Sequence, residues 1–378
     1  MAEQLYFARH TKVFLEQGSN VWEIPVLEGF SFSQATNATE IVLNEMESVG
    51  GVSRRGRKMF NDSYAPAEWS FSTYIRPFIA DVPTAEWEDT NANHHAIEEA
   101  LWANFVAVNA WTPPSAGDSS WTAGVTIGTS DLTFDFDDSN KSILGTFNLW
   151  FDLGNCSGDT SQPYKIADCV VNSASIDFDI DGIAMINWSG FGTVITDEAS
   201  VPAATVTEAT LATSNYIRNR LTTLSMTAAD TATFPGVSAN GVYNAVLTGG
   251  NITFENNITF LTPETLCTVN QPIGHVTGSR NIGGSFTAYL NTDTGATADL
   301  WEDLIGATDV VTNEFALVFS VGGASAPKVV FNLPQCHLEI PTHSIEDVVA
   351  VEVTFAALPS DVTQTDEATI VYTGITHV

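Results

Sequence analysis

The sequence predicts a mainly β protein built from two tandem copies of one domain, and three observations support this prediction. Apolar and polar residues alternate with a period of two along several segments, which is typical of strands with one buried face. Five segments of the first half recur, in the same order, in the second half. Each half also has one short segment with helical periodicity. Together these features predict a β-sandwich or barrel in each copy, with one helix packed outside it.

The alternation is clearest in residues 132–137 (LTFDFD), 175–181 (SIDFDID) and 349–355 (VAVEVTF). Successive side chains of a strand point to opposite faces, so we expect the apolar row of each segment in the core and the polar row in water. The acidic residues expected in water are Asp135, Asp137, Asp177, Asp179 and Asp181.

The repeat consists of five ordered pairs of matching segments. Residues 6–15, 21–27, 69–75, 147–154 and 169–188 match residues 216–225, 242–247, 284–290, 315–322 and 336–355, the last pair without a gap. One such match is weak evidence, but five in the same order indicate duplication. We therefore expect one domain over residues 1–205 and a second over residues 206–378, with an insertion in the first between about residues 75 and 146.

One helix is expected in each copy. Residues 94–108 place four apolar side chains on one face: Ile97, Leu101, Phe105 and Val108. Residues 297–306 begin with a threonine that can cap a helix and end at a glycine, with apolar residues on one face. Both segments are short, so we expect each helix to cover a sheet and not to form a bundle.

The chain is strongly acidic, with 13 Lys and Arg against 45 Asp and Glu among its 378 residues. This balance excludes an ordinary nucleic-acid-binding protein, which needs a basic face to neutralise phosphates, and argues against binding to anionic membranes. A soluble surface suited to a salty habitat would also explain the acidity. No segment reaches the roughly 18 apolar residues of a membrane span, and the N-terminus lacks the apolar stretch of a signal peptide.

Motifs for metal binding or catalysis are weak. Residues 177–182 (DFDIDG) resemble the start of a calcium loop, but Trp188 stands where that loop needs a bidentate Glu, so a strand with an acidic face is favoured. The four cysteines have no metal-binding spacing, and Cys169 and Cys336, which match in the repeat, are expected to be small core residues. We expect no cofactor, no metal and no catalytic residues.

A helical group of two histidines and two glutamates could in principle offer metal ligands. It comprises His94, His95, Glu98 and Glu99. An exposed helix face with pairs four residues apart is the simpler interpretation, because no recognised metal-binding motif is present.

A basic cluster stands out in this acidic chain. Four of the 13 basic residues lie within five positions: Arg54, Arg55, Arg57 and Lys58. Gly50, Gly51 and Gly56 permit the turns of a loop. The cluster indicates contact either with an acidic protein surface or with phosphate, and a single short patch favours the protein surface.

Two segments of the second copy carry a resemblance to a known family. They are residues 251–266 (NITFENNITFLTPETL) and 272–290 (PIGHVTGSRNIGGSFTAYL), in which a TGxR loop leads into a GSFTxYL strand followed by a short helix. The first copy keeps a looser version from Arg57 to residues 69–75, without the PIGH run and with the basic cluster. This pattern resembles the tail tube proteins of tailed bacteriophages.

The resemblance implies a β-sandwich core with an outer helix and a long loop in each copy. It also implies a virion protein of the phage tail, assembled in the host cytoplasm, that is structural and not an enzyme. Six such domains form a ring in this family, so two copies per chain imply homotrimeric rings with pseudo-six-fold symmetry, stacked into a tube. DNA and tape-measure protein would pass through the lumen without specific binding, and a sheath or terminator protein is a further expected partner.

An acidic lumen would repel DNA phosphates over roughly 8 Å at physiological salt, which prevents adhesion without stopping transit. The five aspartates named above are therefore our candidates for the lumen wall. A tandem β-sandwich acting as an adhesion module or as a virion decoration is the alternative function.

Stacked rings also need contacts between subunits, and the basic cluster is our candidate for one. We expect Arg54, Arg55, Arg57 and Lys58 to dock on an adjacent subunit, in the next ring or around the same ring. The residues expected to join this contact are Met59, Phe60, Tyr64 and, at the matching place in the second copy, Arg280.

Overall fold

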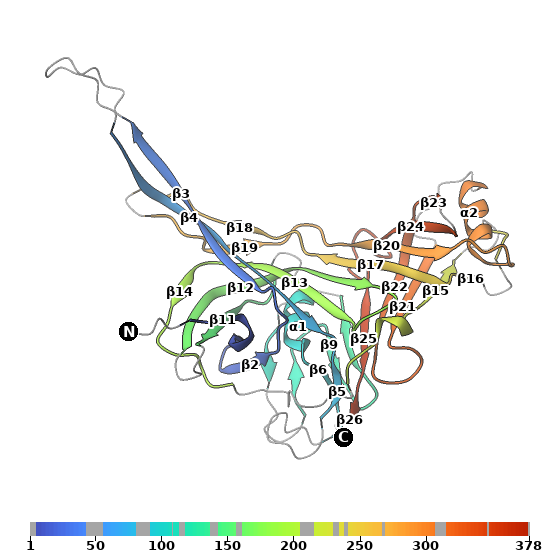
Figure 1. The fold of residues 1–378 in the computed structure, drawn as a ribbon, viewed down its shortest axis with the longest axis horizontal. Helices are drawn as coiled ribbons and strands as arrows, with labels where there is room; N and C mark the ends of the chain where they lie inside the picture. Colours follow the sequence, from blue (N-terminus) through green and yellow to red (C-terminus); the bar gives the residue numbers. More distant parts are fainter. Residues whose placement is uncertain are drawn as a thin grey trace.

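The computed structural model describes thirteen stretches of the chain: residues 5–42, 56–80, 91–107, 109–112, 118–136, 143–155, 161–204, 215–229, 234–237, 241–266, 269–306, 315–345 and 348–376. These residues form a mainly β structure with two α-helices, which confirms the predicted class (Figure 1). Among them, no helix is both long and apolar enough to cross a membrane.

Most strands belong to one large antiparallel sheet. The elements of residues 1–200 are η1 (Ala8–His10), β1 (Lys12–Gln17), β2 (Asn20–Ile24), β3 (Ser31–Val42), β4 (Arg57–Tyr74), β5 (Pro77–Ile79), β6 (His94–Ala96), α1 (Glu99–Val106), β7 (Trp111–Thr112), β8 (Ser120–Trp121), β9 (Val125–Ile127), β10 (Leu132–Asp135), β11 (Phe147–Gly154), β12 (Ser161–Phe178), β13 (Met185–Gly192) and β14 (Ile195–Asp197). The remaining elements are η2 (Asn219–Leu221), β15 (Thr223–Ala228), β16 (Val242–Asn244), β17 (Leu247–Glu255), β18 (Thr259–Leu261), β19 (Gly274–Val276), β20 (Asn281–Tyr289), α2 (Thr297–Gly306), β21 (Phe315–Val321), β22 (Lys328–Leu338), β23 (Thr342–Ile345), β24 (Val349–Ala357), β25 (Thr369–Thr373) and β26 (Ile375–Thr376).

The two halves of the chain have the same strand order. In the first half, hydrogen-bonded neighbours follow the order β2-β1-β11-β12-β13-β4-β3. In the second half they follow β16-β15-β21-β22-β24-β20-β17. A short 3-10 helix precedes the first strand of each series, and an α-helix lies between corresponding strands, α1 after β4 and α2 after β20.

Local irregularities recur at the same places. The ladder between β11 and β12 shifts register just after the pair Phe147–Cys169, and the ladder between β21 and β22 shifts just after Phe315–Cys336. Both cysteines are fully buried, which confirms that they are core residues. Burial raises the pKa of the Cys336 thiol to about 12, so the thiol stays protonated and unreactive.

One sequence match is corrected by the strand register. Trp188 of β13 lies opposite Phe71, whereas the residue opposite Phe286 of β20 is Val353. Since Phe71 and Phe286 hold the same position in their strands, Trp188 corresponds to Val353 and not to Phe355. The match between residues 169–188 and 336–355 therefore contains a gap of two residues, in the connection before β24.

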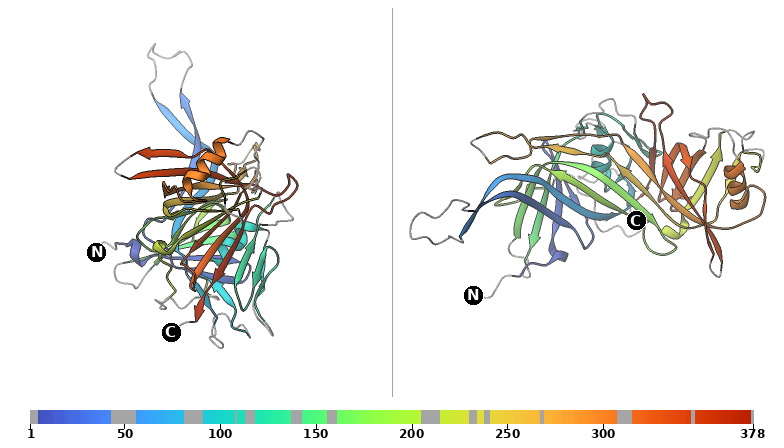
Figure 2. Two further views of the ribbon diagram at one scale, coloured as in Figure 1. Left: turned by 90° about the vertical axis from the view of Figure 1, so that its right-hand side faces the viewer. Right: turned by 90° about the horizontal axis from the view of Figure 1, so that it is seen from above.

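The two halves are joined within one sheet. Residues 173–178 of β12 pair with residues 250–255 of β17, so that β3-β4-β13-β12-β17-β20-β24-β23 form eight consecutive antiparallel strands (Figures 1 and 2). We call this arrangement the eight-stranded sheet, and the β12–β17 ladder its central seam. A single hydrophobic cluster runs through both halves behind it.

Helix α1 is the centre of this cluster. The Trp102 ring lies 4.8 Å from Trp188 and 5.4 Å from Phe254, and its indole N–H donates to the Tyr372 hydroxyl over 2.8 Å. All eight residues of α1 are buried; its two polar side chains, Glu99 and Asn104, are hydrogen-bonded within the core. The helix is shorter than the predicted 94–108, because His94–Ala96 instead form β6 and pair with β5. Helix α2 occupies the predicted residues 297–306.

Candidate functional site

One face of the eight-stranded sheet is polar along its whole width. The hydrogen-bonded register places short polar side chains in rows across the strands, while the opposite side chains of the strands between the two edges, β3 and β23, are buried where these rows cross them. We call this surface the polar face; its residues are Ser31, Ser33, Glu68, Ser70, Ser72, Ser173, Ser175, Asp177, Asn187, Ser189, Asn251, Thr253, Glu255, Ser285, Thr287, Glu352 and Thr354.

The rows follow directly from the pairing of strands. One row runs Ser31, Ser70, Ser189, Ser173 and Glu255 from strand to strand. Neighbouring side chains also bond to one another: the Ser72 hydroxyl donates to Asn187 Oδ1 over 2.7 Å, and Ser31 and Ser70 share a 2.8 Å hydrogen bond. Fixed hydroxyl and amide groups of this kind present a hydrated surface without an apolar patch.

The charges of the polar face all have one sign. Glu68, Asp177, Glu255 and Glu352 are its four charged residues, and each is a carboxylate. They come from four different strands, so negative charge is spread across the sheet. Such a surface repels phosphate groups and offers a polyanion no cation to bind.

Four of the five aspartates predicted from the alternation are among the described residues, and one of these four lies on this face. Asp177 is exposed there, and its carboxylate accepts a long hydrogen bond of 3.4 Å from Asn187 Nδ2. Asp135 lies on β10, which pairs with β9 and β25 and is not one of the eight strands. Asp137 lies outside the described residues.

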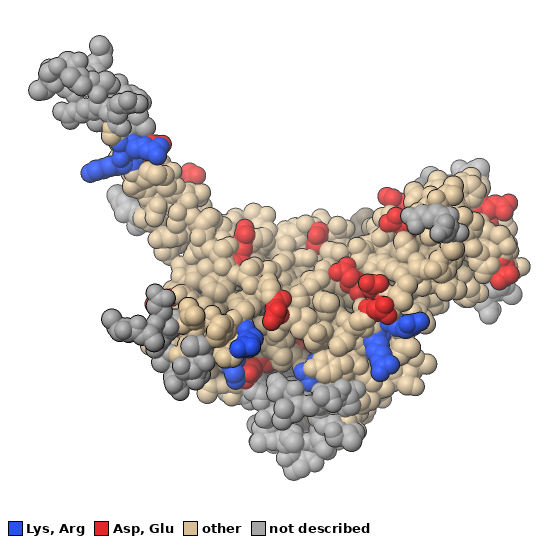
Figure 3. All heavy atoms as spheres, in the orientation of Figure 1, with Lys and Arg blue, Asp and Glu red and all other residues tan. Residues whose placement is uncertain are grey.

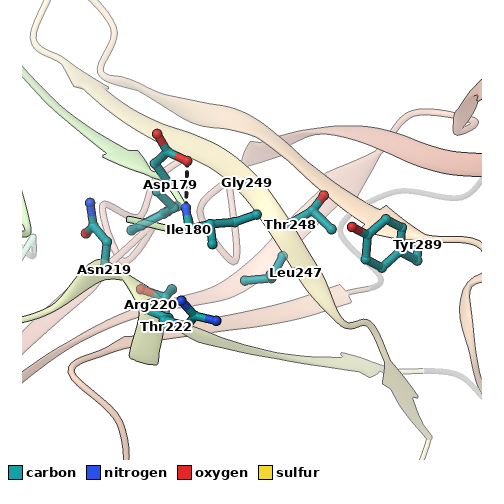
Figure 4. A pocket seen from close by; sticks show the side chains of 10 residues that line it. Asp179, Ile180, Asn219, Arg220, Thr222, Leu247, Thr248, Gly249 and Tyr289 are labelled. Atoms are coloured by element: carbon teal, nitrogen blue, oxygen red, sulfur yellow. Dashed lines mark hydrogen bonds between the residues drawn. The ribbon is translucent and has the colours of Figure 1, made fainter. Parts of the chain in front are cut away.

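Asp179 and Asp181 lie in the turn after β12 and not in a strand. The strand ends at Phe178, and Ile180 is 47% exposed, so the apolar row stops one position earlier than predicted. The Asp179 carboxylate accepts a hydrogen bond from the Ile180 backbone N–H over 2.6 Å, beside Arg220 at the end of the central seam (Figure 4). Asp181 pairs at 3.9 Å with the exposed Arg220 guanidinium, a contact that contributes little energy.

Most of the polar face was missed at the sequence level. Glu352 belongs to the alternating segment 349–355, whose polar row was expected in water, but the candidates were limited to aspartates. Glu68 and Glu255 were not predicted, although WSFSTY in β4 has the same period as the aspartate segments. The uncharged serines and threonines of this face give no charge signal in the sequence.

Two residues of the basic cluster, Arg57 and Lys58, lie at the outer end of the described part of a long hairpin. Strands β3 and β4 remain paired as far as Val42 and Arg57, and the hairpin projects from the body of the molecule (Figure 1, upper left). Arg57 and Lys58 therefore extend a strand where a loop was predicted, and Arg54 and Arg55 lie outside the described residues. Lys and Arg side chains gather visibly at this place (Figure 3).

Apolar side chains accompany these cations. Ile41 is 45%, Met59 66% and Phe60 48% exposed, which is unusual for side chains of this size. The Arg57 guanidinium lies 3.2 Å from Glu40 Oε1 across the hairpin. Tyr64 is half-buried, and its backbone N–H donates to the Asn270 carbonyl over 2.9 Å, so it anchors the hairpin to the segment before β19.

Arg280 does not resemble the hairpin cations. Its side chain is only 11% exposed, and one guanidinium nitrogen, Nη1, lies 2.8 Å from the Phe136 carbonyl and 3.4 Å from a Glu367 oxygen. The same group also lies over the Phe136 ring at 5.0 Å. Within the chain, the charge of Arg280 is therefore engaged by Glu367 and a backbone carbonyl, and its contact with an adjacent subunit stays a prediction.

The group around α1 is buried, contrary to the expectation of an exposed helix face. His95 Nδ1 lies 2.9 Å from Glu99 Oε2, and the Trp121 indole N–H donates to Glu99 Oε1 over 2.7 Å. Residues of β6, β8 and β25 cover the helix, so these side chains never reach water. No cluster of three or more potential metal ligands occurs in the part of the chain that the structure describes.

Comparison with known proteins identifies the family of this chain. The family model described as phage tail tube protein matches residues 106–357. This match covers most of the chain, from the last residue of α1 through the central seam to the end of β24. The chain belongs to the phage tail tube protein family: it is a structural component of the phage tail and not an enzyme.

A particular relative extends the similarity to nearly the whole sequence. Tail tube protein pb6 of Escherichia phage T5 is 32% identical over 380 residues, which covers 96% of this chain and 75% of pb6. The resemblance seen in the loop and strand motifs is thereby confirmed, as is the expected location in the tail of the virion.

Proposed function

We propose that three chains form a closed ring with pseudo-six-fold symmetry, and that stacked rings make a tube lined by the polar face. The observation that carries this proposal is the shared strand order of the two halves together with their edge-to-edge seam. Each half supplies one sheet unit, and the seam shows how one unit follows another. Three chains would then supply six units around an axis.

The proposal includes a tandem duplication, with domains over residues 1–205 and 206–378. It is supported by the common order of seven strands, by the matching register shifts at Cys169 and Cys336, and by a 3-10 helix before β1 and before β15. Elements such as β7, β8, β9 and β10 have no counterpart in the described part of the second half, in agreement with an insertion in the first domain.

The mass of a ring tests the stoichiometry. Three chains of 40.6 kDa give a ring of about 122 kDa. We expect native mass spectrometry of rings released from purified tubes by mild denaturant to give this mass. Cryo-electron microscopy of intact tubes should show three-fold symmetry with six similar units per ring. Six chains per ring would contradict the proposal, and protein that remains dispersed under all conditions would favour a decoration module instead.

The polar face is proposed to be the lumen wall, where DNA and tape-measure protein pass without being bound. This assignment is supported by its sign of charge and by its predominantly short polar side chains; Met185 and Tyr289, at the ends of β13 and β20, are the large side chains exposed on the same side of those strands. Carboxylates near the path of DNA prevent phosphates from settling on the wall, while screening confines the repulsion to roughly 8 Å at physiological salt. Short hydroxyls leave the wall hydrated and smooth.

Reversing the charge of this face should make the tube retain DNA. We expect tubes of a variant with Glu68, Asp177, Glu255 and Glu352 changed to Lys to bind short labelled duplexes, with retention that falls by orders of magnitude between about 50 and 200 mM salt. The matched control changes the same four residues to Gln or Asn, which removes charge without adding cations. Equal retention by the Lys variant and the control, measured by co-sedimentation, would place the polar face outside the lumen.

A further inference from the structure

We propose that the free edge of β3 in one chain pairs with β23 and the residues before it in the next chain, as an antiparallel ladder in which Ser33 lies opposite Thr342. This inference rests on the proposed closed ring and names the surfaces that close it. The partner is a second copy of the chain, and each copy carries both edges.

The central seam is the template for this pairing. Within the chain, residues 173–178 of β12 pair with 250–255 of β17, with Ser173 opposite Glu255 and Phe178 opposite Gly250. In this seam, β17 is the outermost strand of the second half. It pairs with the part of β12 that follows the register shift at Cys169 in the first half. Both strands have counterparts at the other ends of the sheet.

The counterpart of β17 is β3, the outermost strand of the first half. Ser31 lies opposite Ser70 of β4, and Asn251 lies opposite Ser285 of β20. Since Ser70 and Ser285 hold equal positions before Tyr74 and Tyr289, residues 30–35 correspond to residues 250–255.

The counterpart of residues 173–178 is the stretch 340–345, which includes β23. Cys169 and Cys336 occupy the same place at the register shifts, and counting onward from each relates Ser173 to Ile340 and Phe178 to Ile345. The pairing of this stretch with β24 agrees, because Thr342 lies opposite Glu352 of the polar face.

Both counterpart edges are open in the single chain. Within the described residues, β3 pairs only with β4 and β23 only with β24. Ile345 is 82% and Ile340 57% exposed, whereas Phe178 at the seam is 6% exposed and stacks on Phe319 at a centroid distance of 5.4 Å. The exposed Ile345 is what the position of Phe178 would show if the second strand of the seam were removed.

The two edges are also placed for head-to-tail assembly. They bound the eight-stranded sheet at its opposite ends, with β3 toward the left and β23 toward the right of Figure 1. An edge that meets a different edge on the next copy makes a heterologous contact, which closes into a ring when the rotation fits. Open strand edges are normally protected, so two unprotected ones indicate an intended partner.

The template fixes the register. The predicted opposite pairs are Ile340–Ala35, Pro341–Gln34, Thr342–Ser33, His343–Phe32, Ser344–Ser31 and Ile345–Phe30. In this register, Thr342 and Ser33 continue the polar face, as Ser175 and Thr253 do at the central seam. On the other face, Ile345 would meet Phe30, so its large exposed surface would be buried.

Disulfide capture tests this register. In a background with Cys156 and Cys267 changed to Ser, the pair Ser33→Cys and Thr342→Cys places two thiols at directly opposite positions, within the Cα separation that a disulfide spans. We expect oxidised tubes to run as covalent dimers and trimers on non-reducing gels. In the matched control, Thr39→Cys replaces Ser33→Cys, about 20 Å further along β3, and should give no cross-link.

A charge pair gives an independent test. Opposite like charges oppose strand pairing, so Ser33→Lys with Thr342→Lys should assemble poorly, with at least a tenfold loss of tubes, whereas Ser33→Glu with Thr342→Lys should restore them. Tubes that form without the 33–342 cross-link, or that form equally well in both charge variants, overturn this pairing and leave the trimeric ring standing. If the unsubstituted chain forms no three-chain ring, both the proposed ring and the proposed β3–β23 pairing are wrong.

Discussion

A chain in which Arg54, Arg55, Arg57 and Lys58 are replaced by Ser should fold normally but form few long tubes. The hairpin that carries Arg57 and Lys58 projects from the body, and Met59 and Phe60 beside them are 66% and 48% exposed. Each exposed ion pair contributes only about 0–1 kcal/mol, so the loss becomes large through repetition around every ring. We therefore expect mean tube length in negative-stain images to fall several-fold, with unchanged circular dichroism of the unassembled chain.

A second pair of variants separates the charge from the apolar contact. Changing Met59 and Phe60 to Ser should also shorten the tubes, whereas changing Lys328 and Arg220 to Ser, outside the hairpin, should not. The unsubstituted tubes should weaken as salt rises, because screening reduces the ion pairs, and the variant without the four cations should lose most of this salt dependence. Tubes of normal length and stability in that variant would mean that the hairpin cations are solvated and make no contact between subunits.

Replacing Glu98 by Gln should stabilise the chain by about 3 kcal/mol at pH 8 and by little near pH 4.5. Glu98 is fully buried next to α1, and desolvation raises the pKa of its carboxyl from 4.5 to about 7, although the Arg76 guanidinium and the Tyr372 hydroxyl offset part of this shift. Between about pH 4.5 and pH 7, the Glu98 carboxyl therefore keeps its proton in the folded chain and loses it in the unfolded chain. The free energy of unfolding therefore falls as pH rises from about 4.5 to 7, and is level above that range.

Gln is neutral at every pH, so its variant should lack this decline. Urea denaturation of the unassembled chain between pH 4.5 and 8.5 measures the difference, with Glu302→Gln on the exposed side of α2 as the control for a carboxylate in water. Parallel stability curves for Glu98→Gln and the unsubstituted chain would show that Glu98 has the same proton affinity in both states.

Local patterns in the sequence predicted the strands well and the sites less well. The strand predicted from the alternation around Asp177 was correct up to Phe178, where β12 ends and the chain turns. In this turn Gly182 adopts a φ of +100°, which favours glycine, and the Asp179 carboxylate accepts a hydrogen bond from the Ile180 backbone N–H. Acidic residues in such a turn have the same spacing as acidic residues on a strand. The turn is therefore not visible in the periodicity alone.

Pairing between distant segments explains the other differences. His94–Ala96 have a helical pattern with the residues that follow, yet they pair with Pro77–Ile79, and that choice depends on strands far apart in the chain. Burial of His95 and Glu99 likewise depends on Trp121, which packs on them from the inserted segment. By contrast, the place of Cys169 and Cys336 was predictable, because both stand in matching segments of the sequence.

The contacts of the central seam also form at a different stage from contacts between separate chains. Because β12 and β17 belong to one chain, their ladder forms during folding, and its stability does not depend on protein concentration. A contact between separate molecules must instead overcome the loss of translational and rotational freedom at each encounter. Tethering the two strands makes their effective concentration high, on the order of millimolar for short flexible linkers and independent of dilution. A dilute solution of this chain would therefore hold preassembled pairs of sheet units, and dilution would act only on the joints between molecules.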